Sequence, residues 1–432
     1  MMKKILLPLF AAVAMCQSAS AEHTMYLYDR DLGNFNRVSE NGKYAVGCDQ
    51  YDYTGSFIVD ILNPAEMIEI EGGELYDITN DGMAVGAEYE VVSGSYYSRA
   101  AIYVNDEWVR LPESPDCVGQ SIARAVSPDG KRIGGMMFCT AEDSEIGKKY
   151  YPCVWTLNES SNKYELTTYN TIELPDNMGF YTYDMSDDGT IITGLVNTYA
   201  GSQVPAIVKN GELKLWNKLE VKLWPFEYKD KTYYYDTGFV DDIEEGAQAS
   251  YWFSGCLNSI KGRYAFGHRS VATNVDVETG TGTVTHYRSI YDTETDTFTD
   301  VKTGEFFSCG YDNTKAFYTK NNTAYIMNGD ENVAVNEYYE VGDEETIAAV
   351  YDFDSEASVL ACSYLWLNMS ISSYCEAPAL IVADKGPSAV NVVRVEKQGD
   401  NTIHDLQGRR IANDKALAPG IYIKNGEKFI VR

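Results

Sequence analysis

Side chains that could do chemistry are unevenly represented in this sequence. It holds 64 Asp and Glu residues but four His residues. A Ser-His-Asp or Cys-His nucleophile would have to rest on His268 or His286, since the other two lie near the chain ends. No Gly-x-Ser-x-Gly elbow and no glycine motif for dinucleotides or phosphates occurs. The sequence therefore predicts no catalytic residue and no cofactor, and we expect His268 to be structural.

Carboxylates leave two further chemistries to consider. A pair of Asp or Glu residues suffices for glycoside hydrolysis, but among 64 acids no pair stands out. Asp184, Ser186 and Asp188 mimic the opening of a calcium loop, whose twelfth position would be Leu195 instead of the required bidentate Glu. We therefore interpret this phrase as a turn, predict no metal site, and keep a carboxylate-dependent glycoside hydrolase as the alternative function.

Aromatic residues next to carboxylates form the strongest candidate binding segment, between residues 189 and 262. Aromatic rings stack on sugar faces, and carboxylates accept hydrogen bonds from hydroxyls. The candidate ligand-binding residues are Trp224, Tyr233, Tyr234, Tyr235, Asp236 and Trp252. The alternative is that these rings pack the segment against its own fold, or reflect a chain that contains 34 Tyr residues.

This segment interrupts a repeat that organises most of the chain. The unit is a turn of the type Ser-x-Asp-Gly followed by an apolar strand that ends in Gly. Ser bonds the local backbone, Asp tolerates the turn, and Gly supplies the positive φ that closes it. Clear copies occupy residues 38–47, 78–86, 126–135 and 185–194, and weaker ones occupy 259–267, 311–317 and 354–362.

A second apolar strand and a hairpin signal follow each copy. One unit is therefore about four strands in roughly 50 residues, the size of a propeller blade. We predict an all-β fold, a β-propeller of seven four-stranded blades over residues 22–388, plus a small C-terminal β module. A strand at residues 25–28 would complete the last blade and close the ring. An open stack or a two-domain sandwich is the alternative.

The repeat resembles those of known propellers. Residues 127–133, Ser-Pro-Asp-Gly-Lys-Arg-Ile, are similar to the repeat of Tol-system and related WD-like propellers, and the wider pattern resembles HAF-type extracellular repeats. The resemblance covers most of residues 35–385. It implies a propeller and says little about function, because propellers serve many roles.

The tail, residues 389–432, differs from the repeat. It closely resembles the short C-terminal sorting domain of type IX secretion substrates in Bacteroidota, with an Asp-Leu-x-Gly-Arg turn before a Gly-Ile-Tyr strand. The matching positions are Asp405, Leu406, Gly408, Arg409, Gly420, Tyr422, Gly426 and Lys428. The resemblance implies the outer-membrane secretion machinery as a partner. The alternative is an ordinary β-hairpin module.

The N-terminus has the pattern of a secretory signal over residues 1–21. Lys3 and Lys4 form its charged end, residues 5–15 its apolar stretch, and residues 19–21 a small-residue cleavage site. Cys16 raises a lipoprotein alternative. No run is long enough for a transmembrane segment, so we expect a protein that is secreted or held at the extracellular cell surface.

The net charge limits the classes of partner, and the cysteines raise the question of disulfides. The net charge of −29 argues against nucleic acid or an anionic membrane as a partner. Cys139 with Cys153, and Cys362 with Cys375, bracket neighbouring predicted strands and could form disulfides in an exported chain. Buried free thiols are the alternative.

These observations predict a binding or interaction module for an extracellular glycan or protein. The alternatives are the glycoside hydrolase and a structural surface component. The sequence does not identify the ligand.

Overall fold

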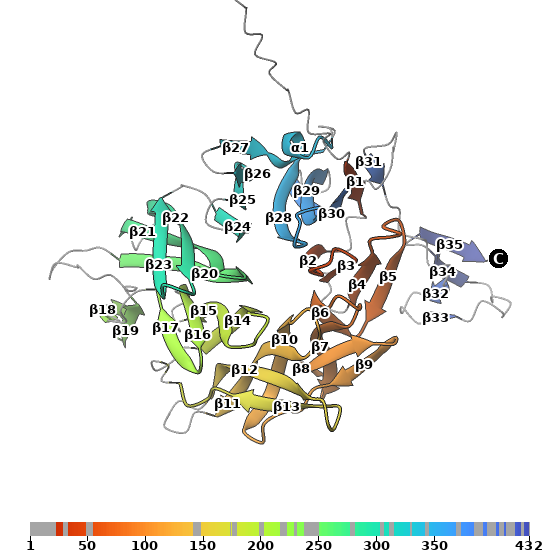
Figure 1. The fold of residues 1–432 in the computed structure, drawn as a ribbon. Helices are drawn as coiled ribbons and strands as arrows, with labels where there is room; N and C mark the ends of the chain where they lie inside the picture. Colours follow the sequence, from red (N-terminus) through yellow and green to blue (C-terminus); the bar gives the residue numbers. More distant parts are fainter. Residues whose placement is uncertain are drawn as a thin grey trace, which may run out of the picture.

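The computed structural model describes twenty-one segments of the chain, most of which form a ring of β-sheets (Figure 1). The described residues are 23–28, 33–48, 55–140, 148–172, 174, 179–197, 203–216, 223–228, 231–236, 250–276, 281–302, 306–310, 315–328, 331–341, 345–368, 373–383, 392–394, 403–405, 410–411, 420–424 and 427–431. The predicted signal at residues 1–21 lies outside them.

Seven four-stranded antiparallel units stand around a common centre, which confirms the β-propeller prediction. Blade 1 comprises β2 (Asn34–Val38), β3 (Tyr44–Cys48), β4 (Gly55–Asp60) and β5 (Met67–Glu71). Blade 2 comprises β6 (Gly73–Ile78), β7 (Ala84–Val92), β8 (Ser95–Val104) and β9 (Glu107–Arg110). Blade 3 comprises β10 (Cys117–Val126), β11 (Arg132–Thr140), β12 (Lys148–Asn158) and β13 (Lys163–Thr168). Blade 4 comprises β14 (Gly179–Met185), β15 (Ile191–Asn197), β16 (Gln203–Lys209) and β17 (Glu212–Leu215).

The second half of the ring contains three more blades and an inserted hairpin. The hairpin pairs β18 (Leu223–Tyr228) with β19 (Lys231–Asp236). Blade 5 comprises β20 (Ser250–Lys261), β21 (Tyr264–Asp276), β22 (Thr281–Asp292) and β23 (Thr297–Lys302). Blade 6 comprises β24 (Phe306–Gly310), β25 (Lys315–Lys320), β26 (Thr323–Asn328) and β27 (Glu331–Ala334), followed by helix α1 (Val335–Tyr338). Blade 7 contains β28 (Ile347–Phe353), β29 (Val359–Asn368) and β30 (Ser373–Ala383).

The N-terminal strand closes the ring. Strand β1 (His23–Leu27) pairs antiparallel with β30, so that it is the fourth strand of blade 7. Its side chains are part of the core, because Met25 and Leu27 are 0% and 1% exposed. This confirms the prediction that the first strand completes the last blade. On its outer side β1 pairs in parallel with β31 (Val392–Arg394), which adds a fifth strand to this sheet.

The C-terminal residues form a separate small sheet, as the fold prediction stated. Its strand order is β33-β32-β34-β35. These strands are β32 (Ile403–Asp405), β33 (Arg410–Ile411), β34 (Gly420–Lys424) and β35 (Glu427–Val431). Among the described residues, no helix is long and apolar enough to cross a membrane.

The repeated turn has the hydrogen bonds that its residue types predict. In the copy after β14, the Ser186 hydroxyl donates to Asp188 Oδ1 at 2.7 Å and accepts from the Ile191 N–H at 3.0 Å. Gly189 then takes a φ of +70°. Because the Asp188 carboxylate also accepts from the Thr190 N–H, turn geometry accounts for the motif that mimics a calcium loop.

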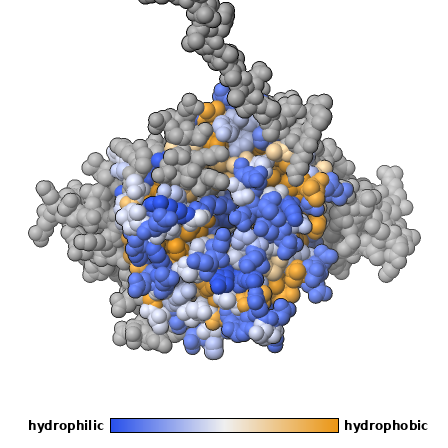
Figure 2. Space-filling model, viewed as in Figure 1, coloured by the Kyte–Doolittle hydropathy of each residue, from blue (hydrophilic) through white to orange (hydrophobic). Residues whose placement is uncertain are grey.

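The turns of neighbouring blades touch one another and therefore lie on one face of the ring. Asn41 N–H donates to the Asn80 side chain, Asn80 N–H donates to the Pro128 carbonyl, and Ser355 N–H donates to the Glu40 carbonyl. We call this the turn face. Since strands alternate in direction, the connections between blades lie on the opposite side, the connector face. In the view of Figure 2 the centre of the ring is mostly hydrophilic.

The closing glycine of the repeat lies where the second strand presses on the innermost one. A Cβ at Gly86 would lie 1.8 Å from the Glu74 carbonyl oxygen, and one at Gly194 would lie 1.9 Å from that of Tyr181. Gly267 is equally crowded by the Cys256 carbonyl at 1.8 Å. Only glycine permits this approach, which explains why the residue recurs.

A bulge follows at the same place in each innermost strand. The register slips by one residue in each of the seven innermost pairs. The extra residues are Asn36, Tyr76, Arg124, Tyr183, Asn258, Ser308 and Tyr351. Bulges re-aim side chains and end pairing, and here they precede the residues that surround the ring centre on the turn face.

Replacing Leu27 by Ala tests the closure of the ring. Because Leu27 is buried between β30 and its neighbours, we expect a loss of about 2–5 kcal/mol in the free energy of unfolding. Urea denaturation followed by circular dichroism measures it. Leu62→Ala, at a side chain that is 78% exposed, is the control and should cost less than about 0.5 kcal/mol. Equal effects of the two variants would contradict closure by β1.

Candidate functional site

The residue after each bulge occupies one equivalent position in every blade. In ring order from blade 1 to blade 7 these residues are Arg37, Asp77, Ala125, Asp184, Ser259, Cys309 and Asp352. Four of these seven residues carry a charge, although the strands in which they lie are largely buried. Such a concentration of buried charge requires partners, and the structure supplies them from neighbouring blades.

Three aspartates at this position each fasten their blade to the next one. Asp352 accepts a hydrogen bond from the Val38 N–H at 3.0 Å, Asp77 from the Val126 N–H at 2.7 Å, and Asp184 from the Ile260 N–H at 2.9 Å. The three donors are also equivalent residues of their strands. We call this contact the aspartate clasp. It joins blades 7 to 1, 2 to 3, and 4 to 5.

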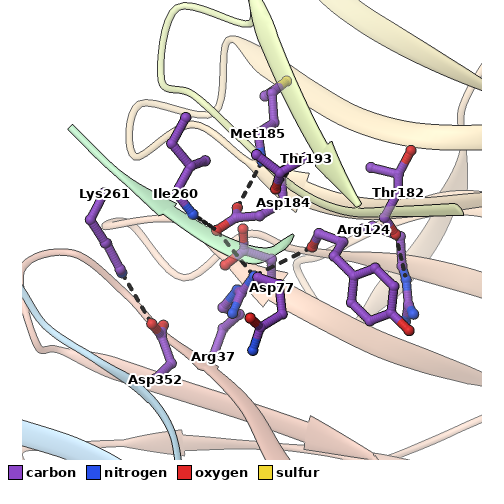
Figure 3. Close-up of polar contacts among 12 residues, drawn as sticks. Arg37, Asp77, Arg124, Thr182, Asp184, Met185, Thr193, Ile260, Lys261 and Asp352 are labelled. Carbon is purple, nitrogen blue, oxygen red and sulfur yellow. Dashed lines mark hydrogen bonds and ion pairs between the residues drawn. The ribbon is translucent and has the colours of Figure 1, made fainter. Parts of the chain in front are cut away.

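Arg37 crosses the ring from blade 1 to the other side. Its Nη2 lies 3.2 Å from Asp184 Oδ2 and donates to the carbonyls of Tyr183 and Asn258 at 3.3 and 3.1 Å. Its side chain is 12% exposed. The guanidinium thereby neutralises one clasp and satisfies two carbonyls at bulges of blades 4 and 5 (Figure 3).

Arg124 and Lys261 supply the other two central cations. The Arg124 guanidinium lies 4.1 Å from the centre of the Tyr76 ring and 5.4 Å from that of Tyr183, and it donates to the Thr182 carbonyl at 3.3 Å. Lys261 Nζ lies 3.1 Å from Asp352 Oδ1. Burial alone would lower the pKa of Lys261, but the Asp352 carboxylate more than offsets this and the pKa is raised.

A cavity of about 410 Å³ opens from this network on the turn face. Its charged lining consists of Arg37, Glu40, Asp77, Asp184, Asp187, Lys261, Arg263, Asp352 and Asp354. All three cations are already paired, with Arg263 bound to Asp292 and Glu294. The side chains of Glu40 and Asp187 have no hydrogen-bond partner among the described residues. The cavity therefore offers two free carboxylates at its exposed rim.

Burial, with the charges of neighbouring acids, raises the pKa values of Asp187 and Asp77 at this cavity. Burial, followed by the charges of Glu40 and Asp184, raises the pKa of Asp187. Burial raises the pKa of Asp77 to about 7, although the Arg37 guanidinium and two backbone N–H donors oppose this shift. A bound cation would relieve the excess negative charge, because opposite charge favours the ionised carboxylates.

The predicted aromatic segment is divided between two elements. Trp224 pairs with Tyr235 in the hairpin, and two-residue periodicity places Tyr233 on the same face of the hairpin as both. Tyr234 lies on the other face, and Asp236 pairs with Leu223 at the end of the ladder. Trp252 instead lies in β20 of blade 5, opposite Ala272. The structure describes only the backbone of these residues, so their role as a ligand site stays a prediction.

The two internal histidines lie in blade 5, each near a hydroxyl or a thiol. Nδ1 of His286 is 2.7 Å from the Ser270 hydroxyl, and Nδ1 of His268 is 3.8 Å from Cys256 Sγ. Burial lowers the pKa of His268 to about 4 and raises that of the Cys256 thiol to about 12. Both groups are therefore neutral near pH 7, which is the opposite of an activated thiolate and imidazolium pair.

The cysteines considered as disulfides are thiols in the structure and are not bridged to one another. Cys139 lies opposite Lys149 and Cys153 lies opposite Gly135, so the two do not face each other. Cys362 likewise pairs with Ala379, whereas Cys375 pairs with Trp366. The predicted bracketing of neighbouring strands was correct, but the register separates the sulfurs. Cys139, Cys153 and Cys362 are fully buried, which matches the alternative of buried thiols.

The residues that resemble a sorting motif lie in the small C-terminal sheet where the structure describes them. Asp405 at the end of β32 pairs with Tyr422, Gly420 pairs with Val431, and Lys428 pairs with Ile423. Leu406, Gly408, Arg409 and Gly426 lie outside the described residues. The described part brings Asp405 and the Gly-Ile-Tyr strand of the motif into one sheet.

Sequence reasoning missed the central network, although the repeat contained a signal for it. The residue two places before the turn Ser or Thr is Arg37 in the first copy, Asp77 in the second and Asp184 in the fourth. A charged residue inside an apolar strand is unusual and needs a partner. Aligning the copies at this position would have drawn attention to the ring centre.

No family model matches the chain, and no curated protein sequence matches it. Among solved structures, it is similar to the β-propeller domain of the trilobed protease from Pyrococcus furiosus, with 11% identity, 82% of this chain and 97% of that chain covered, and a TM-score of 0.40. An oligogalacturonate lyase in complex with manganese has 9% identity, 84% and 91% coverage, and a TM-score of 0.40. A putative TolB from Agrobacterium tumefaciens has 10% identity, 62% and 79% coverage, and a TM-score of 0.33. At such values the likeness extends to no site and no activity.

Replacing Asp77 by Asn tests the protonation of its clasp. With a pKa of about 7, folded Asp77 keeps a proton that the unfolded chain loses near pH 4, so its ionisation makes stability fall as pH rises from 4 to 7. We expect the Asp77→Asn variant to lose up to about 1.4 kcal/mol per pH unit of this slope. Urea denaturation at pH 5, 6 and 7 measures it.

Asp129→Asn is the matched control for this slope. Backbone and hydroxyl donors around Asp129 lower its pKa, so it is ionised throughout the pH range tested. This variant should keep the slope of the parent protein. An unchanged slope in Asp77→Asn would contradict the raised pKa.

Proposed function

We propose that this chain is an exported β-propeller that works as a binding module, and that its turn-face cavity receives a cationic group of the partner. The observation that supports this most directly is the imbalance of charge at the cavity. Six carboxylates line it against three cations, and the three cations are already paired. The free carboxylates of Glu40 and Asp187 would accept hydrogen bonds from a lysine, an arginine or a terminal amine.

The partner that fits these features is a basic segment of a protein or peptide. The cavity volume of about 410 Å³ lies in the range of ligand sites and would admit one long side chain. The net charge of −29 would attract such a partner from a distance and speed its encounter. The deeper network, from Arg37 to Asp352, would form a rigid floor.

The glycoside-hydrolase alternative has less support from the described carboxylates. Asp77 accepts hydrogen bonds from two backbone N–H groups, at 2.7 and 2.8 Å, and Asp184 accepts two and pairs with Arg37. The same clasp recurs at Asp352, which is the behaviour of a structural contact. A catalytic acid would need an oxygen that faces its substrate.

The binding proposal is tested with a cationic peptide. Pentaarginine should bind to the full chain, and Glu40→Gln/Asp187→Asn should weaken binding at least about tenfold, or about 1.4 kcal/mol. Pentaglutamate should not bind. Isothermal titration calorimetry at low and high salt measures both, and salt should weaken the binding.

A second double variant separates the cavity from general charge. Asp106→Asn/Glu107→Gln also removes one Asp and one Glu charge, at the exposed residues that join β8 to β9 and outside the described cavity lining. It should bind pentaarginine like the parent protein. Absence of binding, or an equal loss in the two double variants, would overturn the proposal.

We further propose that the chain reaches the cell surface or is released by type IX secretion in a member of the Bacteroidota. The sequence of residues 1–21 and the resemblance of residues 402–432 to sorting domains support this. The small sheet of β32 to β35 also supports it, because its described strands are distinct from the seven blades.

Deleting residues 402–432 tests the sorting proposal. The truncated chain should keep its propeller, as judged by circular dichroism, and accumulate in the periplasm of a type IX secreting host. Accessibility to added protease on intact cells measures surface delivery. A chain with the same residues in scrambled order should also be retained. Normal delivery of either variant would refute the proposal.

A further inference from the structure

A larger cavity lies between blades 6 and 7 on the connector face. Its volume is about 800 Å³, within the range of ligand pockets. The described lining residues are Asn321, Asn322, Thr323, Glu345, Thr346, Tyr364, Leu365, Trp366, Leu367 and Tyr374. They come from the turn between β25 and β26, the residues before β28, the C-terminal end of β29 and the start of β30. The cavity shares no lining residue with the turn-face cavity.

One wall of this cavity offers the side-chain amides of a tight turn. Asn321 and Asn322 form the two-residue turn between Lys320 and Thr323, with φ values of +50° and +58°. Asn adopts such left-handed conformations more readily than most residues, which suits both positions to this tight turn. Both residues are exposed, and neither side-chain amide bonds another described residue. The amides can therefore donate to and accept from a ligand.

The other wall is aromatic and apolar. Tyr374 and Leu367 are direct partners across the β29–β30 ladder and are 66% and 46% exposed. Trp366, next in the chain, packs against the buried core of blades 6 and 7, so that the wall has a firm base. An exposed tyrosine ring that lines the same cavity as two amides suits a hydroxylated, ring-shaped ligand, since its apolar face stacks and its edge makes hydrogen bonds.

The charge of the lining narrows the class of ligand. Among its described residues Glu345 is the one charged group, and Lys and Arg are absent. Anionic ligands such as phosphates or uronic acids would find no cation and would meet a chain of net charge −29. We propose that this cavity binds a neutral oligosaccharide, stacked on Tyr374 and hydrogen-bonded by Asn321 and Asn322. This site is independent of the cationic partner proposed for the turn face.

The test uses the full chain and a set of neutral oligosaccharides. Cellohexaose, xylohexaose, mannohexaose and laminarihexaose are titrated by calorimetry up to about 1 mM, a range that detects weak carbohydrate binding. At least one should bind. Tyr374→Ala should weaken it at least about tenfold, or about 1.4 kcal/mol. Asn322→Gly, which keeps the left-handed turn and removes the amide, should weaken it several-fold.

Tyr96→Ala is the matched control. Tyr96 is 64% exposed on β8 of blade 2 and lies outside the cavity lining, so its loss should leave affinity unchanged. Circular dichroism of each variant shows that the fold is kept. The proposal is overturned if none of the four sugars binds. It is also overturned if Tyr374→Ala binds as tightly as the parent protein, or if Tyr96→Ala loses as much affinity as Tyr374→Ala.

Discussion

Seven innermost strands converge on one centre, and in blades 1 to 5 a glycine of the second strand lies directly against the innermost one. At Gly86, Gly194 and Gly267 the second strand lies so close that a Cβ would overlap a backbone carbonyl. A bulge beside this contact lets each inner strand turn away. The next residue then faces the equivalent residues of other blades. The bulges thus bring charged side chains of several blades, among them Arg37, Asp184 and Asp352, to the centre of the ring, where they need partners.

Some of these carboxylates have hydrogen-bond and cation partners among the described residues and others do not, and the candidate site consists of those that do not. Where the position holds Asp, as in blades 2, 4 and 7, a clasp to the next blade forms. Burying a carboxylate is costly unless it is paired and hydrogen-bonded, and Arg37 and Lys261 provide those pairs for Asp184 and Asp352. Above this level the acids Glu40 and Asp187 have no such partners in the part of the chain that the structure describes. The cations are therefore paired within the fold, and the carboxylates of Glu40 and Asp187 carry the binding that we propose.

The sequence predicted what depends on local chemistry and missed what depends on neighbours in space. Turns, strand order and the closing role of β1 follow from residue types along the chain, as in the hydroxyl and glycine of Ser186 and Gly189. Arg37 contacts residues about 150 and 220 positions away, which no local pattern encodes. The cysteine pairs failed for a smaller reason, because placing Cys153 opposite Gly135 needs the register and not only adjacency. The cavity between blades 6 and 7 likewise combines a turn of one repeat copy with a hairpin of the next, and no pattern within one copy predicts that they meet.

The pairing of His23 with Ala383 means that the first strand to be synthesised is among the last to find its place. Some 360 residues must emerge before β30 is available, and closing so long a loop carries an entropic cost that only the finished ring repays. Until then blade 7 has an open edge and its apolar residues Met25 and Leu27 are uncovered. Such a chain folds slowly and late. Under the export proposed above, closure of the ring would wait until β30 has also crossed the membrane, so that the chain could pass in an extended state.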